Sequence, residues 1–501
     1  MKRLYLSLSA LAAIFFFFNS CKKDELDDNN AQNAVVSQFV YDGMSTYYLW
    51  ANAMKDIKPS STSEPLTYFE SILNATDKKQ GWSWITDDVQ ALLAEFAGTP
   101  KDFGFDLMLL WTDSKMKTLV GIVKYVYPNT PASEAGITRG DIFTKINNQD
   151  ITLSNYEALF GVSAITITFT NQHSSNVREV TVTPREIETD PVLYHQVYET
   201  QGHKIAYLFY TGFISNYNNR LYQVFSEFKE QDVTDIILDL RYNHGGSVTA
   251  ASYLSSLIAP KADVENKSVL VKMSYNSFLN EYFDTEGYSR TDNLGEYDSK
   301  SEQNPLNANL NLSSNTVYII ATGDSYSASE LITYCLRNYM NVVHVGEETG
   351  GKYTASITIH GYDESVGATV YDENSLSKIE KNSLENWAMQ PIIAEYTNKN
   401  STSFANPGYL TPDYPIESLE NNPSAWRPIG DTTDYLLANT ISIITTGKPM
   451  SISRQSAPKS SKIPANLFSK KDNLKKESVI LNNFKLSATD AENIRQQMKL
   501  R

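Results

Sequence analysis

Apolar positions recur with different periods in successive parts of the chain. In residues 35–55, 65–74 and 87–96 they return every three or four residues, which is the pattern of helices with one buried face. After Asp102 the apolar runs become short and end at glycine or asparagine, as in strands joined by turns. After Asp190 strand-like and helix-like runs follow each other in turn, and this alternation predicts an α/β domain.

One turn in the α/β part is built around two glycines. Strands are predicted at 205–210, 235–240, 316–322 and 342–345, and helices at 221–229, 247–257 and 331–337. The second strand ends in Asn243-His244-Gly245-Gly246. A double glycine between a strand and a helix permits a sharp turn with outward-pointing amides, which suits either a phosphate or an oxyanion. No Gly-Lys-Ser/Thr sequence follows, and this argues against a phosphate loop.

A second turn of small residues, at 325–330, reads Ser-Tyr-Ser-Ala-Ser-Glu. A serine at a helix start lies where unpaired amides and the helix dipole favour negative charge. Ser327 and Glu330 also fit the Ser-x-x-Glu capping box, so the pattern alone is more typical of a helix cap than of a nucleophile. The strand at 342–345 leads to Gly350-Gly351-Lys352, where two glycines let the chain bend tightly and present the lysine at one place.

The β-rich middle part has its own sequence pattern. Pro-Ala at 131–132 and Ala-Gly-Ile at 135–137 precede Gly-Asp-Ile at 140–142, which predicts a short helix, a turn and a strand. This segment resembles a PDZ domain, a fold that binds an extended peptide, often by its C-terminal carboxylate, at a sheet edge. The resemblance implies that the loop of Phe103, Gly104 and Phe105 offers amides to that carboxylate. The alternative is a small β-domain without a peptide ligand.

Taken together, the motifs of the α/β part resemble those of one peptidase family. They are Asp-Leu-Arg at 239–241, Gly245-Gly246, the serine-rich turn at 325–330 and Gly351-Lys352. This combination is similar to the C-terminal processing (tail-specific) proteases, the S41 serine peptidases. The resemblance implies a multidomain α/β protein with a small helical N-terminal domain, a PDZ-like β-domain and a crotonase/ClpP-like α/β protease core.

The resemblance also implies roles for single residues. Ser327 would be the nucleophile and Lys352, 25 residues further on, its base. A lysine acts as a base only when neutral, so burial would have to lower its pKa from about 10.4. The amide of Ala328, with that of Gly245 or Gly246, would hold the oxyanion.

Two positions depart from the family pattern. Ser356 stands four residues after the lysine, where many members have a glutamine that orients it, and Asn338 stands where some have an aspartate. Ser356 is therefore the candidate for orienting Lys352. Two alternatives remain open: a serine–histidine hydrolase that uses His344 or His360, and a non-catalytic peptide-binding lipoprotein on the same scaffold. The histidines and carboxylates show no metal-ligand spacing, and no metal or other cofactor is expected.

The N-terminus resembles an export signal. Lys2 and Arg3 precede an apolar run at 4–18 that is too short to span a membrane, and the run ends at Phe-Asn-Ser before Cys21. This resembles a lipobox, in which Cys21 is lipidated, against the simpler alternative of a secretory signal with an incidental cysteine. We therefore expect a lipid-anchored protein of the outer membrane in the cell envelope, on its periplasmic side or at the cell surface.

Composition and charge add limits to this picture. Apolar residues make up 41% of 501, which is globular composition with ample material for a core. A net charge of −15 argues against nucleic acid, and the expected partners are peptides or protein C-termini and a membrane; the oligomeric state stays open. The expected division is a signal peptide 1–20, a polar tether 21–33, a helical domain 34–98, a PDZ domain 99–187, a peptidase core 188–447 and a basic, flexible tail 448–501 with a short helix at 488–499.

Overall fold

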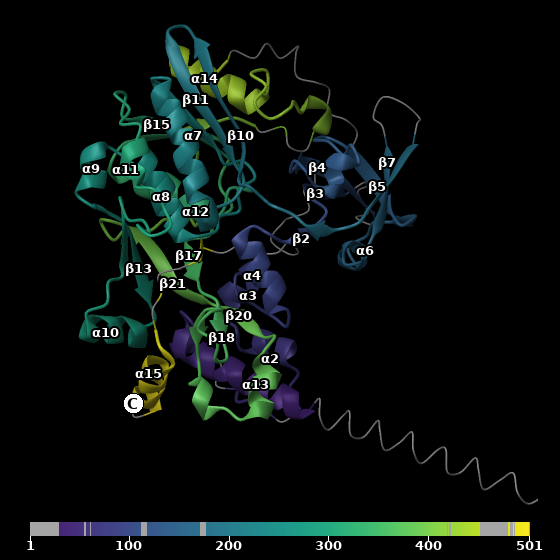
Figure 1. Cartoon of the computed structure of the whole chain (residues 1–501), viewed down its shortest axis with the longest axis vertical. Helices are drawn as coiled ribbons and strands as arrows, with labels where there is room; N and C mark the ends of the chain where they lie inside the picture. Colours follow the sequence, from purple (N-terminus) through teal and green to yellow (C-terminus); the bar gives the residue numbers. More distant parts are fainter. Residues whose placement is uncertain are drawn as a thin grey trace, which may run out of the picture.

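A computed structural model of the chain shows a helical lower part, a small β-domain to one side and an α/β core (Figure 1). It describes residues 30–54, 57–60, 62–111, 118–170, 177–417, 419, 422–450, 479–480, 484 and 486–499. The predicted signal peptide and Cys21 lie outside these residues. Residues 30–33, predicted to belong to the tether, are already helical. Among the described helices, none combines the length and the apolar character needed to cross a membrane.

The helical N-terminal part is joined to the core by a strand. Its elements are a helix over residues 30–47, η1 (Ala51–Ala53), α2 (Pro65–Ile72), α3 (Ala75–Gln80), β1 (Trp84–Thr86) and α4 (Val89–Ala97). The first helix ends eight residues earlier than the periodicity predicts, although Phe39, Met44 and Tyr48 are all buried as expected. Strand β1 pairs antiparallel with β20 (Ala388–Gln390). The helices therefore pack onto the core and not only onto one another.

The β-domain has a sheet and a core of its own. Its sheet runs β3-β4-β5-β7-β8, formed by Phe105–Trp111, Leu119–Val126, Ile142–Ile146, Ile165–Thr170 and Val177–Val182, with β6 (Gln149–Asp150), α5 (Pro131–Glu134) and α6 (Tyr156–Phe160) beside it. Strand β3 lies at one edge of this sheet. The domain begins and ends at one place, because β2 (Lys101–Asp102) pairs with β9 (Arg185–Glu186).

The core is built on a six-stranded sheet with helices on both faces. Its order is β10-β11-β12-β15-β16-β22, formed by Val192–Thr200, His203–Tyr210, Asp235–Asp239, Thr316–Ala321, Asn341–Gly346 and Tyr414–Pro415. Apart from β10 the strands are parallel, and β11, β12, β15 and β16 are mostly buried, as central parallel strands require. Helices α7 (Asn218–Glu230), α8 (Val248–Ile258) and α12 (Ala328–Cys335) cover one face, and α14 (Tyr435–Thr446) packs against the other.

A second sheet joins the core to the helical part. Its order is β14-β13-β21-β17-β23, formed by Thr291–Asn293, Val269–Tyr275, Ile392–Asn398, Thr354–Ser356 and Val479–Ile480. The segment 261–311 supplies β13, β14, α9 (Lys261–Glu265), α10 (Ser277–Glu286) and α11 (Pro305–Ala308). The segment 363–382 supplies β19 (Ala368–Thr369), η4 (Glu373–Ser375) and the start of α13 (Lys378–Leu384). Strand β19 pairs with β18 (Ile359–His360).

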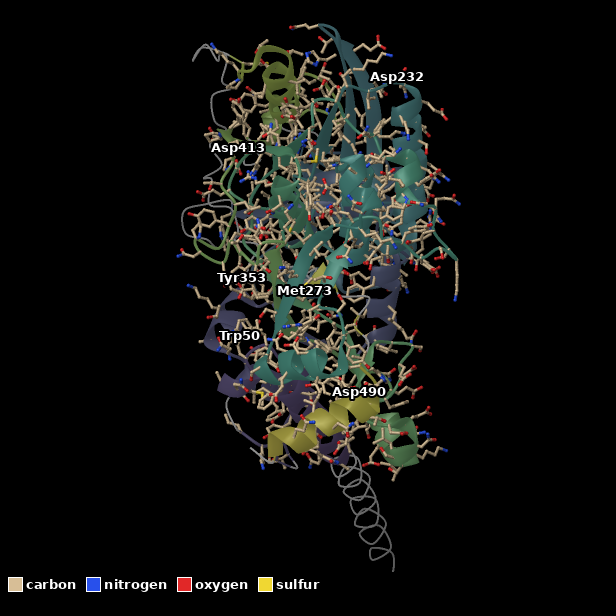
Figure 2. All side chains as sticks on the ribbon, turned by 90° about the vertical axis from the view of Figure 1, so that its left-hand side faces the viewer. Trp50, Asp232, Met273, Tyr353, Asp413 and Asp490 are labelled. Atoms are coloured by element: carbon tan, nitrogen blue, oxygen red, sulfur yellow. The ribbon has the colours of Figure 1, made fainter. Side chains whose placement is uncertain are left out.

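The described end of the chain is packed against the core, which corrects the expectation of a flexible tail for these residues. Helix α15 (Ala488–Lys499) stands where the sequence predicts a helix. Figure 2 shows it with Asp490 at the lower end of the molecule, below Met273 of β13. Ala491 and Ile494 are buried in the same apolar cluster as the first helix. Residues 451–478 lie outside the described part.

Candidate active site

The two small-residue turns predicted from the sequence lie against each other. They follow β12 and β15, which are parallel neighbours, so both turns emerge at the same edge of the sheet. The Ser325 hydroxyl donates to the Leu240 carbonyl at 2.7 Å, and the Ser329 hydroxyl donates to the Asn243 carbonyl at 2.9 Å. The Tyr326 amide donates to the same Asn243 carbonyl at 3.0 Å. Side chains of the serine turn thus fix the backbone of the glycine turn.

Ser327 differs from the serines on either side of it. Its φ is 59° and its ψ −109°, a conformation that residues with a side chain rarely adopt and that is typical of constrained functional positions. The residue is fully buried, and its hydroxyl has no hydrogen-bond partner within the part of the chain that the structure describes. Its amide donates to Glu330 at 2.8 Å. Of the two hydrogen bonds of the predicted capping box, only the one that the Glu330 side chain accepts is formed.

The contrast among these serines gives a stability prediction. Ser327→Ala removes a buried hydroxyl without a partner, so we expect the free energy of unfolding to rise by about 1 kcal/mol. Ser325→Ala, the matched control, removes a hydroxyl bonded to both Leu240 and Thr322 and should lower that energy by about 1–3 kcal/mol. Urea unfolding of the two variants checks this. A loss at Ser327 as large as that at Ser325 would show that the Ser327 hydroxyl is structural.

Glu330 joins the serine turn to the lysine loop. Its carboxylate is fully buried and accepts the Ser327 amide at 2.8 Å and the Lys352 amide at 2.7 Å on one oxygen. The other oxygen accepts the Gly351 amide at 2.8 Å and the Thr349 hydroxyl at 2.5 Å. One side chain thus fixes the backbones of both predicted catalytic residues.

The electrostatics of Glu330 follow from this environment. Burial raises the pKa of its carboxyl from 4.5 to about 7, although the hydrogen bonds from Thr349, Lys352, Ser327 and Gly351 work in the opposite direction. Near neutral pH the group therefore lies close to its midpoint. Its charge state is set by the balance between desolvation and four donated hydrogen bonds.

Tyr396 of β21 provides a second link between the same two residues. Its hydroxyl lies 3.1 Å from the Ser327 carbonyl oxygen and 2.8 Å from that of Lys352, and its single proton is shared between these two acceptors. Tyr396 and Lys352 are both fully buried. Burial also keeps the pKa of the Tyr396 phenol far above its usual value, so the hydroxyl stays a donor. Ser327 and Lys352, 25 residues apart in sequence, are therefore held on either side of one glutamate and one tyrosine.

The glycine turn lies directly against the nucleophile candidate. Gly245 and Gly246 have φ values of 110° and 130°, which side chains disfavour. A Cβ atom on Gly245 would lie 2.8 Å from Cβ of Ser327 and 2.9 Å from the amide nitrogen of Ala328. The Gly245 amide donates to the Asn243 side chain at 2.8 Å, which removes it as an oxyanion donor. No described hydrogen bond takes the amide of Gly246 or Ala328, and these two remain the candidates.

Buried charges support the glycine turn from below. The Arg241 guanidinium donates to Asp239 at 2.7 Å and to Asp434, the N-cap of α14, at 2.7 Å. Tyr207 donates to Asp239 at 2.7 Å. Paired in this way the charges are satisfied although buried, and they fix the end of β12 where the turn begins.

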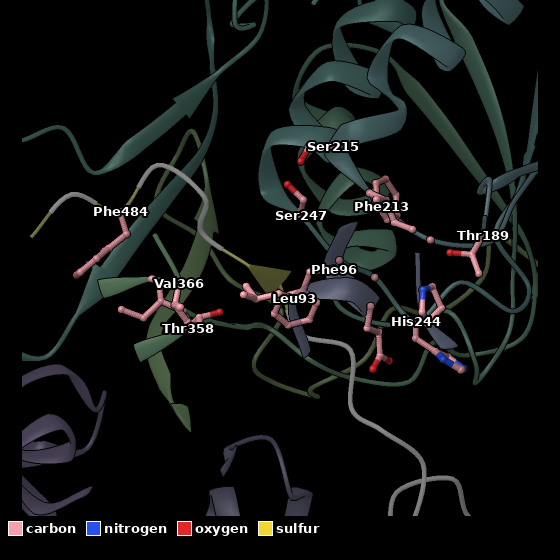
Figure 3. Close-up of a pocket in the computed structure, with 18 of the residues that line it drawn as sticks. Leu93, Phe96, Thr189, Phe213, Ser215, His244, Ser247, Thr358, Val366 and Phe484 are labelled. Carbon is pink, nitrogen blue, oxygen red and sulfur yellow. The ribbon is translucent and has the colours of Figure 1, made fainter. Parts of the chain in front are cut away.

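The glycine turn opens on a cleft of about 1000 Å³ (Figure 3). Its wall contains His244 to Ser247 of the glycine turn and Phe213 beside them. Other parts of the chain also contribute, among them Leu93 and Phe96 of α4, Phe105 and Tyr125 of the β-domain, Val366 of the segment 363–382, and Phe484 and Leu486 near the end of the chain. This wall mixes apolar and polar side chains, and the segments 261–311 and 363–382 contribute Tyr288 and Val366 to it.

The β-domain reaches the serine turn through a buried lysine. Lys124 of β4 is fully buried, forms an ion pair with Asp106 and lies 4.0 Å from a carboxylate oxygen of Asp324, three residues before Ser327. Arg139 donates to the Tyr242 hydroxyl at 2.9 Å. The β-domain is thus held against both turns by charged and aromatic contacts.

The predicted carboxylate loop is partly occupied by its own chain. The Gly104 amide donates to Asp102 at 2.7 Å, and the Phe103 carbonyl accepts the amide of Ala132. Phe105 begins β3 and pairs with Val126. In this structure the loop therefore presents Gly104 to an internal carboxylate.

Comparison with known proteins agrees with the arrangement described above. The family model described as peptidase family S41 matches residues 204–416, the peptidase S41 N-terminal domain matches residues 36–84, and a PDZ domain matches residues 122–160. The chain belongs to peptidase family S41. The match covers the part that contains the glycine turn, the serine turn and Lys352, and the β-domain described above is a PDZ domain.

Curated and solved relatives of this S41 chain are distant. Carboxyl-terminal-processing peptidase 2, chloroplastic, of Arabidopsis thaliana is 24% identical over 234 residues, which are 45% of this chain and 40% of that protein. The carboxyl-terminal-processing protease of a Picosynechococcus strain is 28% identical over 136 residues, 26% of this chain and 33% of that protein. The chain thus matches less than half the length of these curated relatives. A putative S41 protease of Bacteroides fragilis, 22% identical with a TM-score of 0.58 over 81% of this chain and 96% of its own, shares the fold.

The structure gives the remaining predicted residues local partners. The Ser356 hydroxyl donates to Gln390 at 3.0 Å. His360 accepts the Asp363 amide at 2.9 Å and lies 3.3 Å from the Glu385 carbonyl, so it supports a turn of the S41 core. His344 is buried in β16, where burial lowers its pKa to about 4. Within the described ranges, no group of three or more histidines, cysteines or carboxylates is arranged to hold a metal.

Sequence reasoning missed three residues of the S41 site. Glu330 was assigned only to a helix cap, and neither Thr349 nor Tyr396 was considered. The spacing from Glu330 to Lys352 gives no sign of a contact, because the contact depends on how β16 returns the chain to the serine turn. Tyr396 lies 44 residues beyond Lys352, and no local pattern distinguishes it from the other tyrosines.

Proposed function

We propose that this S41 chain is a serine endopeptidase that cleaves peptides or the C-terminal regions of proteins, with Ser327 as nucleophile and Lys352 as base. The observation that carries the proposal is the shared anchoring of both residues by Glu330 and Tyr396. A helix cap needs no such link to a buried lysine. The names of the two carboxyl-terminal-processing relatives support the substrate class.

The chemistry begins with attack of the Ser327 hydroxyl oxygen on the scissile carbonyl carbon while its proton passes to neutral Lys352. The amides of Ala328 and Gly246 then stabilise the oxyanion; loss of one such donor typically costs about 3–4 kcal/mol. Collapse breaks the C–N bond, and Lys352 returns the proton to the leaving amine. Water hydrolyses the acyl-enzyme by the same route, which releases a carboxylic acid and restores the hydroxyl.

In this structure the Ser327 hydroxyl has no hydrogen bond to Lys352 or to any other described residue. Catalytic hydrogen bonds are often long before substrate binds and shorten only in the complex. The Ser327 side chain is fully buried, so a substrate must also gain access to it from the cleft beside Gly245. Both observations fit a site that is completed when the peptide enters. Labelling of Ser327 by a serine-directed probe separates this enzyme from a peptide-binding protein without catalysis.

The PDZ domain is proposed to present the substrate. Strand β3 lies at the sheet edge, where an extended peptide adds in this fold, and Phe105 at its start also lines the cleft. Phe103, Gly104 and Phe105 would receive the peptide carboxylate once the Asp102 side chain is displaced from Gly104. Lipidation at Cys21 would place the enzyme in the cell envelope.

The substrate proposal predicts a preference for free C-termini. Two peptides of one apolar sequence, one ending in a carboxylate and one in an amide, should be cleaved by the wild type with a KM at least fivefold lower for the carboxylate. Mass spectrometry of the products gives the rates, and Ser327→Ala should cleave neither peptide. Equal cleavage of both would remove the tail preference and leave the peptidase proposal standing, whereas cleavage by Ser327→Ala would refute Ser327 as nucleophile.

A further inference from the structure

The end of the described chain lies beside the cleft and contributes to it. Phe484, Leu486, Ser487 and Asp490 all line the cleft that the glycine turn also lines. Figure 3 shows Phe484 across the pocket from His244. Along the chain, β23 (Val479–Ile480) comes before Phe484 and α15 comes after it. This end of the chain is therefore placed where a substrate would have to pass.

Strand β23 occupies a sheet edge close to the predicted base. It pairs in parallel with β17, Val479 opposite Ala355 and Ile480 opposite Ser356, while the other edge of β17 pairs with β21. Strand β17 begins at Thr354, two residues after Lys352. A polypeptide added to this edge thus runs next to the loop that carries Lys352.

The pairing is short, but the segment is strongly anchored. Only two residue pairs join β23 to β17, and a pairing of this length contributes few hydrogen bonds. Helix α15 is held by Arg495, which is buried and donates to the Val370 carbonyl at 2.8 Å, and by Ile494 in the apolar core. Because α15 is docked, it keeps β23 at a high effective concentration beside β17, so the short pairing forms although it is weak. A competing strand can still displace β23 while α15 stays in place.

We propose that the edge of β17 opposite β21 is the place where the extended substrate chain adds as a strand, and that residues 479–480 occupy this edge as an internal competitor. The ligand is an extended polypeptide segment bound mainly through its backbone, as in strand addition generally. The inference rests on the proposed peptidase function and adds a substrate-binding edge to it. Substrate entry then requires β23 to leave while α15 stays docked.

Proline at the edge tests the competition. In the full chain, Val479→Pro with Ile480→Pro removes both backbone N–H groups of β23 and so weakens its pairing with β17. The KM for an extended peptide should then fall about fivefold or more while kcat stays unchanged. Ala488→Pro is the matched control, because it puts proline at the first position of α15, where proline is tolerated, and should leave KM unchanged. An unchanged or raised KM in the double variant would overturn the proposal.

A second measurement needs no change in β23 and no catalysis. Hydrogen exchange is followed in full-length Ser327→Ala with and without a saturating synthetic peptide of the chain's own sequence 477–486. The amides of 479–480 should exchange at least fivefold faster with the peptide, while those of 354–356 remain protected by the incoming strand. Unchanged exchange at 479–480 would refute displacement. This exchange experiment involves no hydrolysis, so it tests only the displacement of β23. A wild-type protein that cleaves no peptide would refute the proposed peptidase function and leave the exchange result unaffected.

Discussion

Replacing Lys352 by alanine should lower kcat/KM for peptide hydrolysis by about 10³-fold or more, because the Ser327 hydroxyl then has no group to take its proton. Lys352→Arg should be equally inactive, since a guanidinium stays protonated and cannot act as a base. Both variants should also lose covalent labelling by a serine-directed probe. The comparison separates the chemistry of a neutral amine from the presence of a positive charge.

Two controls decide how this result is interpreted. Lys261→Ala removes a half-exposed lysine that pairs with Glu265 on the surface and should leave kcat/KM unchanged. His360→Ala tests the serine–histidine alternative; it disturbs the turn at Asp363 but should leave labelling of Ser327 intact. If His360→Ala abolished labelling of Ser327 while Lys352→Ala kept it, the proposal of a Ser327–Lys352 dyad would be refuted.

Glu330→Gln should lower kcat by about 100-fold or more without a matching rise in KM. Each carboxylate oxygen of Glu330 accepts two hydrogen bonds, and a glutamine would turn an NH₂ group toward two of these donors. Hydrogen bonds to a charged group contribute about 1.5–3 kcal/mol each, so either the serine turn or the lysine loop should move. Glu330 acts through Ser327 and Lys352 and is a positioning residue.

The pH dependence of stability distinguishes this role from a general loss of fold. The folded-state pKa of Glu330 is raised from 4.5 to about 7, so the folded chain holds this proton more tightly than the unfolded chain. Its contribution to the free energy of unfolding is therefore fully present below about pH 4.5 and is lost as the pH rises to about 7. In Glu330→Gln this loss should be absent over the same range.

Glu348→Gln is the matched control, because Glu348 is exposed on the loop that precedes Lys352. It should change neither kcat nor the pH dependence of urea unfolding. If Glu330→Gln kept wild-type kcat, the carboxylate would be only a helix cap and the anchoring argument for the dyad would fail.

The sequence by itself determined the order of the parts and the identity of the two turns. Alternating strand-like and helix-like runs predicted an α/β core because parallel strands buried on both faces need continuous apolar runs, as in Ile236 to Leu238 and Val317 to Ala321. The double glycine at 245–246 was identifiable because only glycine adopts both φ values easily. These are local properties, and local sequence specifies them.

The sequence was less informative where the outcome depended on partners. The tail at 448–501 has a polar, basic composition that predicted flexibility, yet a few apolar residues, Leu486, Ala491 and Ile494, suffice to dock its described end. The spacing of Ser356 from Lys352 follows the family pattern, but that spacing gives no sign of the hydrogen bond that the Ser356 hydroxyl donates to Gln390 on another strand. Composition and spacing contain no information about which distant residue lies opposite.

The candidate site shows the same division. Ser327 in its sequence is indistinguishable from a helix cap, and the structure distinguishes it by its positive φ and by its buried hydroxyl without a hydrogen-bond partner among the described residues. Only the tertiary structure decided that Glu330 and Tyr396 hold both Ser327 and Lys352. The physical reason is that these bonds close loops of 22 to 69 residues, and only the packing of strands β15, β16 and β21 brings their ends together.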